Sequence, residues 1–312
     1  MAKIKYRRYY IYYLLKVAIS IVSFLPLRVS LVIADLLGKL VFALLPKYRR
    51  VAIDNLNEAL GPDEARNAKI VRKLFSNLVK NGAEWIKLAA IDPSDLDKVV
   101  TESEGLENLD EGLRGGKGVI VLAFHFGNWE LTGMYLRHKG YPGQTIVRRL
   151  YFHKYDKLIN RVRKHFDVHV IYRDESPKKM LKVLKANGIM GIVPDQDIDS
   201  IEGTFVNFFG RPAFTPTAPV KLAMVSGAKI VPVFVVRKAD GTHKLFADKV
   251  IDVSSATKSE EDVRKCTQEW SDVLERFVRE YPDQWVWVHE RWKTQPDAGA
   301  AEPALTGRGS EK

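Results

Sequence analysis

The sequence predicts one α/β domain with a largely parallel sheet flanked by helices, preceded by a hydrophobic helical segment. Short continuous apolar runs, typical of buried strands, alternate with stretches whose apolar residues recur at helical spacing. Strands joined through helices form parallel sheets, because each crossover helix packs on a face of the sheet. The expected strands are 119–124, 145–147, 168–172, 189–193 and 230–236, and the expected helices are 63–90, 155–166, 177–186, 219–226 and 260–280.

The length of the chain indicates its domain organisation, and its net charge indicates the kind of partner that it attracts. The chain has 312 residues and a formal net charge of +11. Its length suffices for one large domain with a sizeable core. The charge attracts anionic partners such as phosphates, acidic carrier proteins and anionic lipid headgroups. The single cysteine, Cys266, excludes an internal disulfide and any cysteine-based metal cluster.

Residues 1–46 differ in composition from the rest of the chain. Residues 9–27 are nearly all apolar or aromatic, with Lys16 as the one charge among them. This run just reaches the ~20 apolar residues that a helix needs to cross a bilayer core. No small-residue cleavage site follows, so a cleavable signal peptide is not expected. The run is preceded by a basic cluster made of Lys3, Lys5, Arg7 and Arg8.

A second apolar run, 29–45, contains Asp35 and Lys39, which lie on one face of a helix as a pair. We therefore expect residues 1–46 to form a membrane-anchoring helical segment, with two core helices of a soluble domain as the alternative. Residues 47–293 are the expected α/β domain. Residues 294–312 are poor in bulky apolar side chains and are expected to be a disordered tail.

Two common kinds of site are not supported by the sequence. Gly115, Gly116 and Lys117 lack the glycine spacing and the following Ser or Thr of a phosphate-binding loop. There is no His-Glu-x-x-His motif and no close set of His and carboxylates at metal-ligand spacing. We therefore expect neither a nucleotide-binding loop nor a metal.

The strongest candidate site is 123–130, Ala-Phe-His-Phe-Gly-Asn-Trp-Glu, in which His125 and Glu130 are five residues apart. It lies where a predicted strand ends in a glycine-bearing loop before a helix, the position at which α/β proteins present reactive groups. Two other pairs with this spacing straddle predicted strands and are interpreted as ordinary side chains. They are His169 with Asp174 and His243 with Asp248.

Histidine and carboxylate together suggest general-base chemistry. If Asn128 caps the following helix, Glu130 falls in its first turn. The loop can then fold His125 back, so that the carboxylate accepts the imidazole N–H and fixes the tautomer. The other ring nitrogen is then free to take a proton from a hydroxyl, and the ordinary pKa of histidine suits this role. On the residues alone, a hydrogen-bonded structural histidine is an equal alternative.

The segment from His125 to Glu130 resembles the His-x4-acid signature of the lysophospholipid and lipid A acyltransferases. It is most similar to the lauroyl and myristoyl transferases of lipid A biosynthesis. Three further blocks follow in the order of that branch, and a fourth resembles its C-terminal block. These blocks are 145–150, 191–197, 207–219 and 281–293, so the resemblance covers about residues 10–293.

The resemblance implies roles for two arginines. Arg148 matches the family arginine that holds a phosphate of the acceptor, a task that suits a planar guanidinium, and Arg149 would share it. The family commonly has an Asn-Pro pair shortly after this arginine. Residues 152–155 read Phe-His-Lys-Tyr instead, so this chain departs from the family pattern in that loop.

Other residues are assigned to the acceptor site or to packing. Asp195, Gln196 and Asp197 would border the acceptor, although acidic residues after a strand also cap turns. Asn128 is a further candidate substrate-binding residue. Three tryptophans near the end of the chain are interpreted as packing residues, namely Trp285, Trp287 and Trp292.

The resemblance implies an acyltransferase in which an acceptor hydroxyl, deprotonated by His125, attacks a thioester. The donor would be an acyl carrier protein or coenzyme A thioester, with no other cofactor. The acceptor would be a phosphorylated glycolipid precursor of lipid A, and no nucleic acid is expected as a partner. We expect the inner membrane as the location, with the catalytic domain on its cytoplasmic face. The alternatives are an acyltransferase acting on a lysophospholipid or another glycolipid, and a noncatalytic lipid-binding membrane protein of the same fold.

Overall fold

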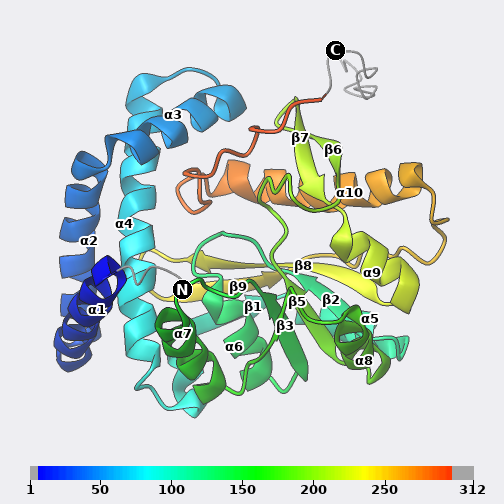
Figure 1. Ribbon diagram of the computed structural model, residues 1–312, viewed down its shortest axis with the longest axis horizontal. Helices are drawn as coiled ribbons and strands as arrows, with labels where there is room; N and C mark the ends of the chain where they lie inside the picture. Colours follow the sequence, from blue (N-terminus) through cyan, green and yellow to red (C-terminus); the bar gives the residue numbers. More distant parts are fainter. Residues whose placement is uncertain (1–5, 297–312) are drawn as a thin grey trace.

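A seven-stranded sheet forms the centre of the computed structural model, which describes residues 6–296 (Figure 1). Its strand order is β1-β9-β8-β2-β5-β3-β4, and every neighbouring pair is parallel except β8 with β9. The prediction of a largely parallel sheet is therefore confirmed. The strands are β1 (Val100–Glu104), β2 (Val119–Leu122), β3 (Gly143–Val147), β4 (His169–Tyr172), β5 (Ile189–Ile192), β8 (Lys229–Arg237) and β9 (His243–Ala247).

The five strands expected from apolar runs are β2, β3, β4, β5 and β8. Strands β1 and β9 are additional, and so is a separate antiparallel hairpin of β6 (Gly203–Phe208) and β7 (Arg211–Pro216). Strand β1 reads Val-Thr-Glu-Ser-Glu and buries only its first residue, so it has no apolar run to reveal it. Strand β9 alternates buried and half-buried residues because it lies near the edge of the sheet.

The alternation of side chains along β2 divides the interior into two cores. Ile120 and Leu122 belong to one core with α8, α9, α10 and the tryptophans near the chain end. Val119 and Val121 belong to the other core with α5, α6 and α7. Since successive strand residues point to opposite faces, helices must cover both sides of the sheet. These helices are α5 (Leu106–Arg114), α6 (Glu130–His138), α7 (His153–His165), α8 (Pro177–Lys185), α9 (Ala218–Ser226) and α10 (Glu260–Glu280).

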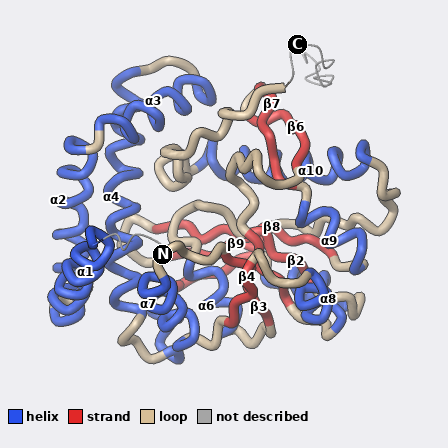
Figure 2. The backbone as a smooth tube through the Cα atoms, in the orientation of Figure 1, coloured by secondary structure: helices blue, strands red, loops and turns tan. Residues whose placement is uncertain are grey.

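The N-terminal part of the chain is helical and lies to one side of the sheet (Figure 2). Helix α2 packs along α4 through a stripe of small buried residues, Ser30, Ala34 and Gly38. The predicted pair of Asp35 and Lys39 is confirmed, with 2.8 Å between Nζ and Oδ2. A 3₁₀ turn, η1 (Pro93–Lys98), connects this part to β1. The helices are α1 (Tyr6–Phe24), α2 (Leu27–Leu44), α3 (Pro46–Leu60) and α4 (Glu64–Leu88).

The large apolar residues of this helical part face outward. Apart from Tyr151 and Val225, every exposed large hydrophobic residue in the described part of the chain lies between Tyr10 and Tyr48. Within residues 6–296, no one helix has the length and hydrophobicity to cross a membrane, whereas α2 and α3, bent by 90°, meet these criteria as a pair. The predicted boundary at residue 46 coincides with that bend. The division into anchor and catalytic domain stays a prediction, and most of the predicted tail lies beyond the described residues.

The loop after β2 depends on a glycine. Gly127 has a φ of 53°, in the left-handed region, and an added Cβ would lie 1.7 Å from the carbonyl oxygen of Val235. The Gly127 N–H donates to the carbonyl of Gln284 at 2.8 Å, and the Val286 N–H donates to the carbonyl of His125 at 3.0 Å. The loop is thus hydrogen-bonded to residues 284–286 and is also packed against β8.

We expect Gly127→Ala to lower the free energy of unfolding by at least about 2 kcal/mol, because it adds a steric clash to the left-handed strain. Gly116→Ala is the matched control, since Gly116 has a φ of 66° but no atom within 4 Å of its added Cβ. The control should cost only about 1 kcal/mol. Thermal and chemical denaturation measure both variants, and equal losses would show that the close approach to Val235 is unimportant.

Candidate functional site

The topology of the sheet joins two distant parts of the sequence at one edge. Strands β2 and β5 are parallel neighbours, so both carboxyl ends lie at the same edge. His125 follows β2 and Asp195 follows β5. In open α/β sheets this edge is where ligands bind. The resemblance predicts that Asp195 borders the acceptor, whereas the structure places this residue against the candidate base.

Asp195 holds His125 by its ring and by its backbone. Nδ1 of His125 lies 2.7 Å from Oδ1 of Asp195, and the His125 backbone N–H donates to Oδ2 at 2.9 Å. The indole N–H of Trp285 donates to the same Oδ2 at 2.9 Å. An ionised carboxylate can only accept, so the ring proton must lie on Nδ1. Nε2 therefore keeps its lone pair.

Burial and charge act in opposite directions on this pair. Burial disfavours the charged imidazolium, but the charge of Asp195 and its hydrogen bond outweigh burial and raise the pKa of His125 above 6.5, with a smaller contribution from Glu130. Burial would also raise the pKa of Asp195, whereas the charge of His125 and the hydrogen bonds from His125 and Trp285 lower it to about 2. Asp195 is thus ionised at neutral pH, and His125 is a stronger base than a free imidazole.

The prediction that Glu130 accepts the imidazole N–H is wrong in this structure. Glu130 begins α6 and forms a two-pronged ion pair with Arg163 of α7, at 3.0 Å to Nε and 2.6 Å to Nη2. A bidentate charge-assisted pair of this kind is stronger than one bond to a neutral ring. Glu130 still lines the same cavity as His125. Its contribution to catalysis stays a prediction.

The predicted roles of Asn128 are also wrong. Asn128 is buried, and its amide donates to Oε2 of Glu84 at 2.8 Å instead of capping α6 or facing the cavity. Glu84 also forms a buried ion pair with Arg237. The amide of Asn81 donates to the carbonyl of Gly127 at 2.6 Å. A buried carboxylate needs several donors, and Asn128 supplies one of them.

The two predicted phosphate-binding arginines are separated. Arg148 follows β3 and lines the cavity, with its guanidinium 5.8 Å from the ring of Tyr151. Arg149 points to Asp174 at 3.4 Å and stacks on Tyr172 at 3.7 Å, away from the cavity wall. Neighbouring residues in an extended segment point to opposite sides, which accounts for this division.

Gln196 connects His125 to a second histidine. Its amide nitrogen lies 2.8 Å from Nε2 of His289, and 3.3 and 3.2 Å from the two ring nitrogens of His125. An atom equally close to both nitrogens lies across the ring and not along the lone pair of Nε2, so that lone pair stays available. No sequence pattern predicts a role for His289, although this residue lies in the C-terminal block 281–293. Asp197 accepts from the backbone and hydroxyl of Thr294 at 2.8 and 2.7 Å.

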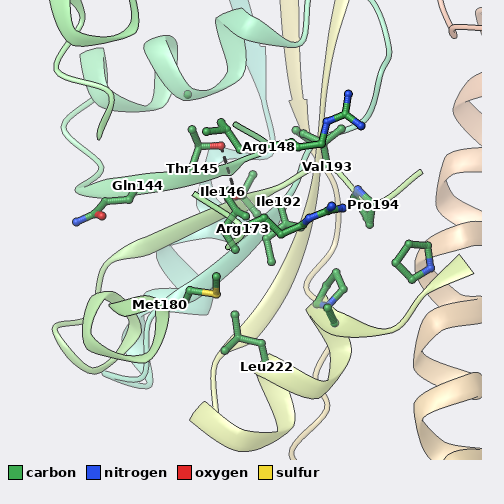
Figure 3. Close-up of a pocket in the computed structure, with 18 of the residues that line it drawn as sticks. Gln144, Thr145, Ile146, Arg148, Arg173, Met180, Ile192, Val193, Pro194 and Leu222 are labelled. Carbon is green, nitrogen blue, oxygen red and sulfur yellow. Dashed lines mark hydrogen bonds between the residues drawn. The ribbon is translucent and has the colours of Figure 1, made fainter. Parts of the chain in front are cut away.

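His125 lines a cavity of about 1020 Å³. Its walls come from the ends of β3 and β5 and from α6 to α9, and His125, Glu130, Gln196 and Asp197 contribute to them. Figure 3 shows Met180 and Leu222 on one side, and Arg148 near Val193 on the other. The volume is at the upper end of that of small-molecule sites. The site therefore combines a base, cationic groups and room for an apolar chain.

The tryptophans confirm the packing interpretation. Trp285, Trp287 and Trp292 are all buried, and the first of them also fixes Asp195. Within residues 6–296, no group of three or more His, Cys, Asp or Glu side chains is arranged to hold a metal ion.

Known proteins resemble this chain over most of its length. It is 23% identical to a lipid A biosynthesis acyltransferase of Haemophilus influenzae, with 89% of this chain and 86% of that protein covered. It is 27% identical to the lipid A biosynthesis lauroyltransferase of Escherichia coli, with 84% of each covered. A phosphatidylinositol mannoside acyltransferase of Mycobacterium tuberculosis is 27% identical over 63% of this chain, and the match spans 60% of that protein.

A solved 1-acyl-sn-glycerophosphate acyltransferase from Thermotoga maritima aligns with 17% identity and a TM-score of 0.35. The alignment covers 82% of this chain and 99% of that one. This structural similarity is too low to support an assignment. The model of the bacterial lipid A biosynthesis acyltransferases, in contrast, matches residues 1–294. The chain therefore belongs to the bacterial lipid A biosynthesis acyltransferase family.

Proposed function

We propose that this protein transfers a fatty acyl group from a thioester to a hydroxyl of a phosphorylated glycolipid, with His125 as general base and Asp195 as its partner. One observation carries the proposal. A buried, ionised carboxylate lies 2.7 Å from Nδ1 of a histidine in the wall of a large cavity with apolar residues. That arrangement supplies a base with a fixed tautomer and room for an acyl chain.

The chemistry follows from these positions. Nε2 of His125 takes the proton of the acceptor hydroxyl, and the oxygen attacks the carbonyl carbon of the thioester. The carbon–sulfur bond then breaks, and the leaving thiolate takes the proton from the imidazolium. Asp195 stabilises that imidazolium and holds the ring, as the aspartate does in a Ser-His-Asp triad. The substrate supplies the nucleophile, so the reaction needs no further cofactor.

The family and its named relatives support an acylated sugar lipid as the acceptor. We infer a lipid A precursor with a free hydroxyl on an acyl chain, and an acyl carrier protein thioester as donor. Arg148 and Arg173, both in the cavity wall and without an ion pair among the described residues, would hold phosphate. The mannoside acyltransferase relative makes another glycolipid the rival acceptor.

His125→Ala tests the proposed reaction directly. We expect it to lower kcat by about 10²–10⁴-fold in a protein that still folds, because it removes the base. The melting temperature should fall, since the ring is also a donor to the buried Asp195 carboxylate. The assay follows acyl-lipid product by mass spectrometry with purified protein. His165→Ala, at an exposed histidine on α7, is the matched control and should keep full activity. Wild-type rates in His125→Ala would refute the mechanism.

Asp195→Asn and Glu130→Gln distinguish the two candidate partners of the base. Asp195→Asn should lower kcat by at least about a hundredfold, and Glu130→Gln by about tenfold, because Asp195 is bonded to the ring whereas Glu130 is paired with Arg163.

The pH profile of Asp195→Asn gives a second readout. The neutral imidazole is the active form, so the rate falls as pH drops through the pKa of His125, which Asp195 holds above 6.5. Without that charge, burial lowers the pKa, and the acid limb of kcat/KM should move to lower pH. A larger loss in Glu130→Gln, or an unmoved acid limb in Asp195→Asn, would contradict the assignment.

We further propose that the N-terminal helices dock on the cytoplasmic face of the inner membrane. Helix α2 supports this, because small residues face α4 while Val32, Leu36 and Leu40 are more than half exposed. Exposure of these apolar side chains to water is unfavourable. Contiguous apolar patches on a protein surface therefore mark an interaction site. Helix α1 continues the apolar surface, and its Tyr9 ring packs on Phe152 before α7 at 5.1 Å.

The triple variant Val32→Asp, Leu36→Asp and Leu40→Asp should reduce binding to phospholipid vesicles at least about tenfold, given the apolar area withdrawn from lipid. Its activity on detergent-dispersed acceptor should remain near wild type. Val225→Asp, which changes an exposed apolar residue on α9, is the control and should bind vesicles normally. Vesicle co-sedimentation measures the result, and undiminished binding of the triple variant would exclude this surface.

A further inference from the structure

The positive charge of the chain is concentrated around the cavity. Residues 148–188 contain twelve Lys and Arg and four Asp and Glu, so they carry +8 of the net charge of +11. This segment runs from the end of β3 through α7 and β4 to the end of α8. Arg148, Arg163, Arg173 and Met180 from this segment line the cavity. Most of the net positive charge therefore belongs to one segment of the chain, and this segment contributes to the cavity wall.

Helix α8 presents a row of lysines to solvent. Lys178, Lys182 and Lys185 are exposed, and their spacing of four and three residues places them along one face. We call these three residues the lysine row, which extends over about 10 Å at the rise of an α-helix. Within the described range 6–296, none of them forms an ion pair, whereas their neighbour Lys179 pairs with Glu175. The row is thus free to bind another molecule.

The other side of α8 belongs to the cavity. Met180 and Leu181 line it, and Leu184 is fully buried in the core. Figure 3 shows Met180 close to Leu222, on the side of the cavity away from Arg148. A partner bound along the lysine row would therefore lie one helix diameter, about 10 Å, from the space that accepts the chain.

The position of α8 argues against a membrane as the occupant of the lysine row. Helices α1 and α2, which carry the exposed apolar residues, lie toward one end of the longest axis, and α8 lies toward the other (Figure 1). A surface so distant from the apolar face is available to a soluble molecule. Three cations spread along 10 Å match a row of carboxylates on a protein better than the compact phosphates of a nucleotide carrier.

We propose that the lysine row of α8 is the docking surface for an acidic carrier protein that presents the acyl group as a thioester. This rests on the proposed acyl transfer and adds the surface on which the donor of that reaction binds. Opposite charges steer association and fix the orientation of a partner, so they act on encounter more than on chemistry. The lysine row should therefore govern the use of a protein-bound donor and have little effect on a small one.

The test compares two donors in the full-length protein. The variant Lys178→Glu, Lys182→Glu and Lys185→Glu is assayed with acyl carrier protein thioester and with the pantetheine thioester of the same acyl chain. The control variant, Lys69→Glu, Lys249→Glu and Lys258→Glu, makes the same charge change at exposed lysines elsewhere. On the carrier donor, kcat/KM of the α8 variant should fall at least about tenfold, with kcat within about twofold of wild type. On the pantetheine donor it should be unchanged, and the control variant should match wild type on both.

Each other outcome overturns the inference. Unchanged kcat/KM on the carrier donor excludes the lysine row, and equal losses on both donors show a defect of the site itself. A wild-type protein that uses acyl coenzyme A but not the carrier thioester would refute the assigned donor while leaving acyl transfer intact. Failure of the proposed function is separate, since it appears as full activity of His125→Ala on either donor.

Discussion

The hydrogen bond between Nδ1 of His125 and the carboxylate of Asp195 is the contact on which the site depends. A buried carboxylate is costly unless donors surround it, and this one accepts from the imidazole, a backbone N–H and the indole of Trp285. Two of these donors belong to His125, and the third, Trp285, lies 90 residues after Asp195 in the chain. The same bond leaves Nε2 as the acceptor, so the buried pair sets both the geometry and the protonation state of the base.

A second buried carboxylate, that of Glu84, holds the loop that contains His125 through a hydrogen bond to Asn128. Glu84, on α4, binds Asn128 of that loop and Arg237 of β8. Burial alone would raise the pKa of Glu84. His243 and Arg237 outweigh burial and lower this pKa to about 2. Because α4 also packs against α2, the helices with the outward apolar surface share a rigid support with the loop. In the proposed function, docking on a membrane and orientation of the base therefore depend on one helix.

Much of the architecture could be predicted from the sequence, because apolar runs and helical spacing report burial directly. The buried strands and the long amphipathic helices agree with expectation, whereas polar strand β1 gave no such signal. The partner of His125 could not be predicted by spacing, since Asp195 becomes a neighbour only through the adjacency of β2 and β5. Glu130 was the nearer candidate along the chain, but Arg163, 33 residues further on, takes its carboxylate.

The protonation state of the His125 ring can be measured directly. Heteronuclear NMR of the histidine ring nitrogens, assigned by comparison with His125→Asn, reports which nitrogen carries the proton and at what pH the ring titrates. If Asp195 holds His125 as its geometry indicates, Nδ1 carries the proton, Nε2 is free, and the pKa of the ring lies above 6.5 and falls in Asp195→Asn. A proton on Nε2 in the neutral ring, or a titration that Asp195→Asn leaves unmoved, would contradict this arrangement.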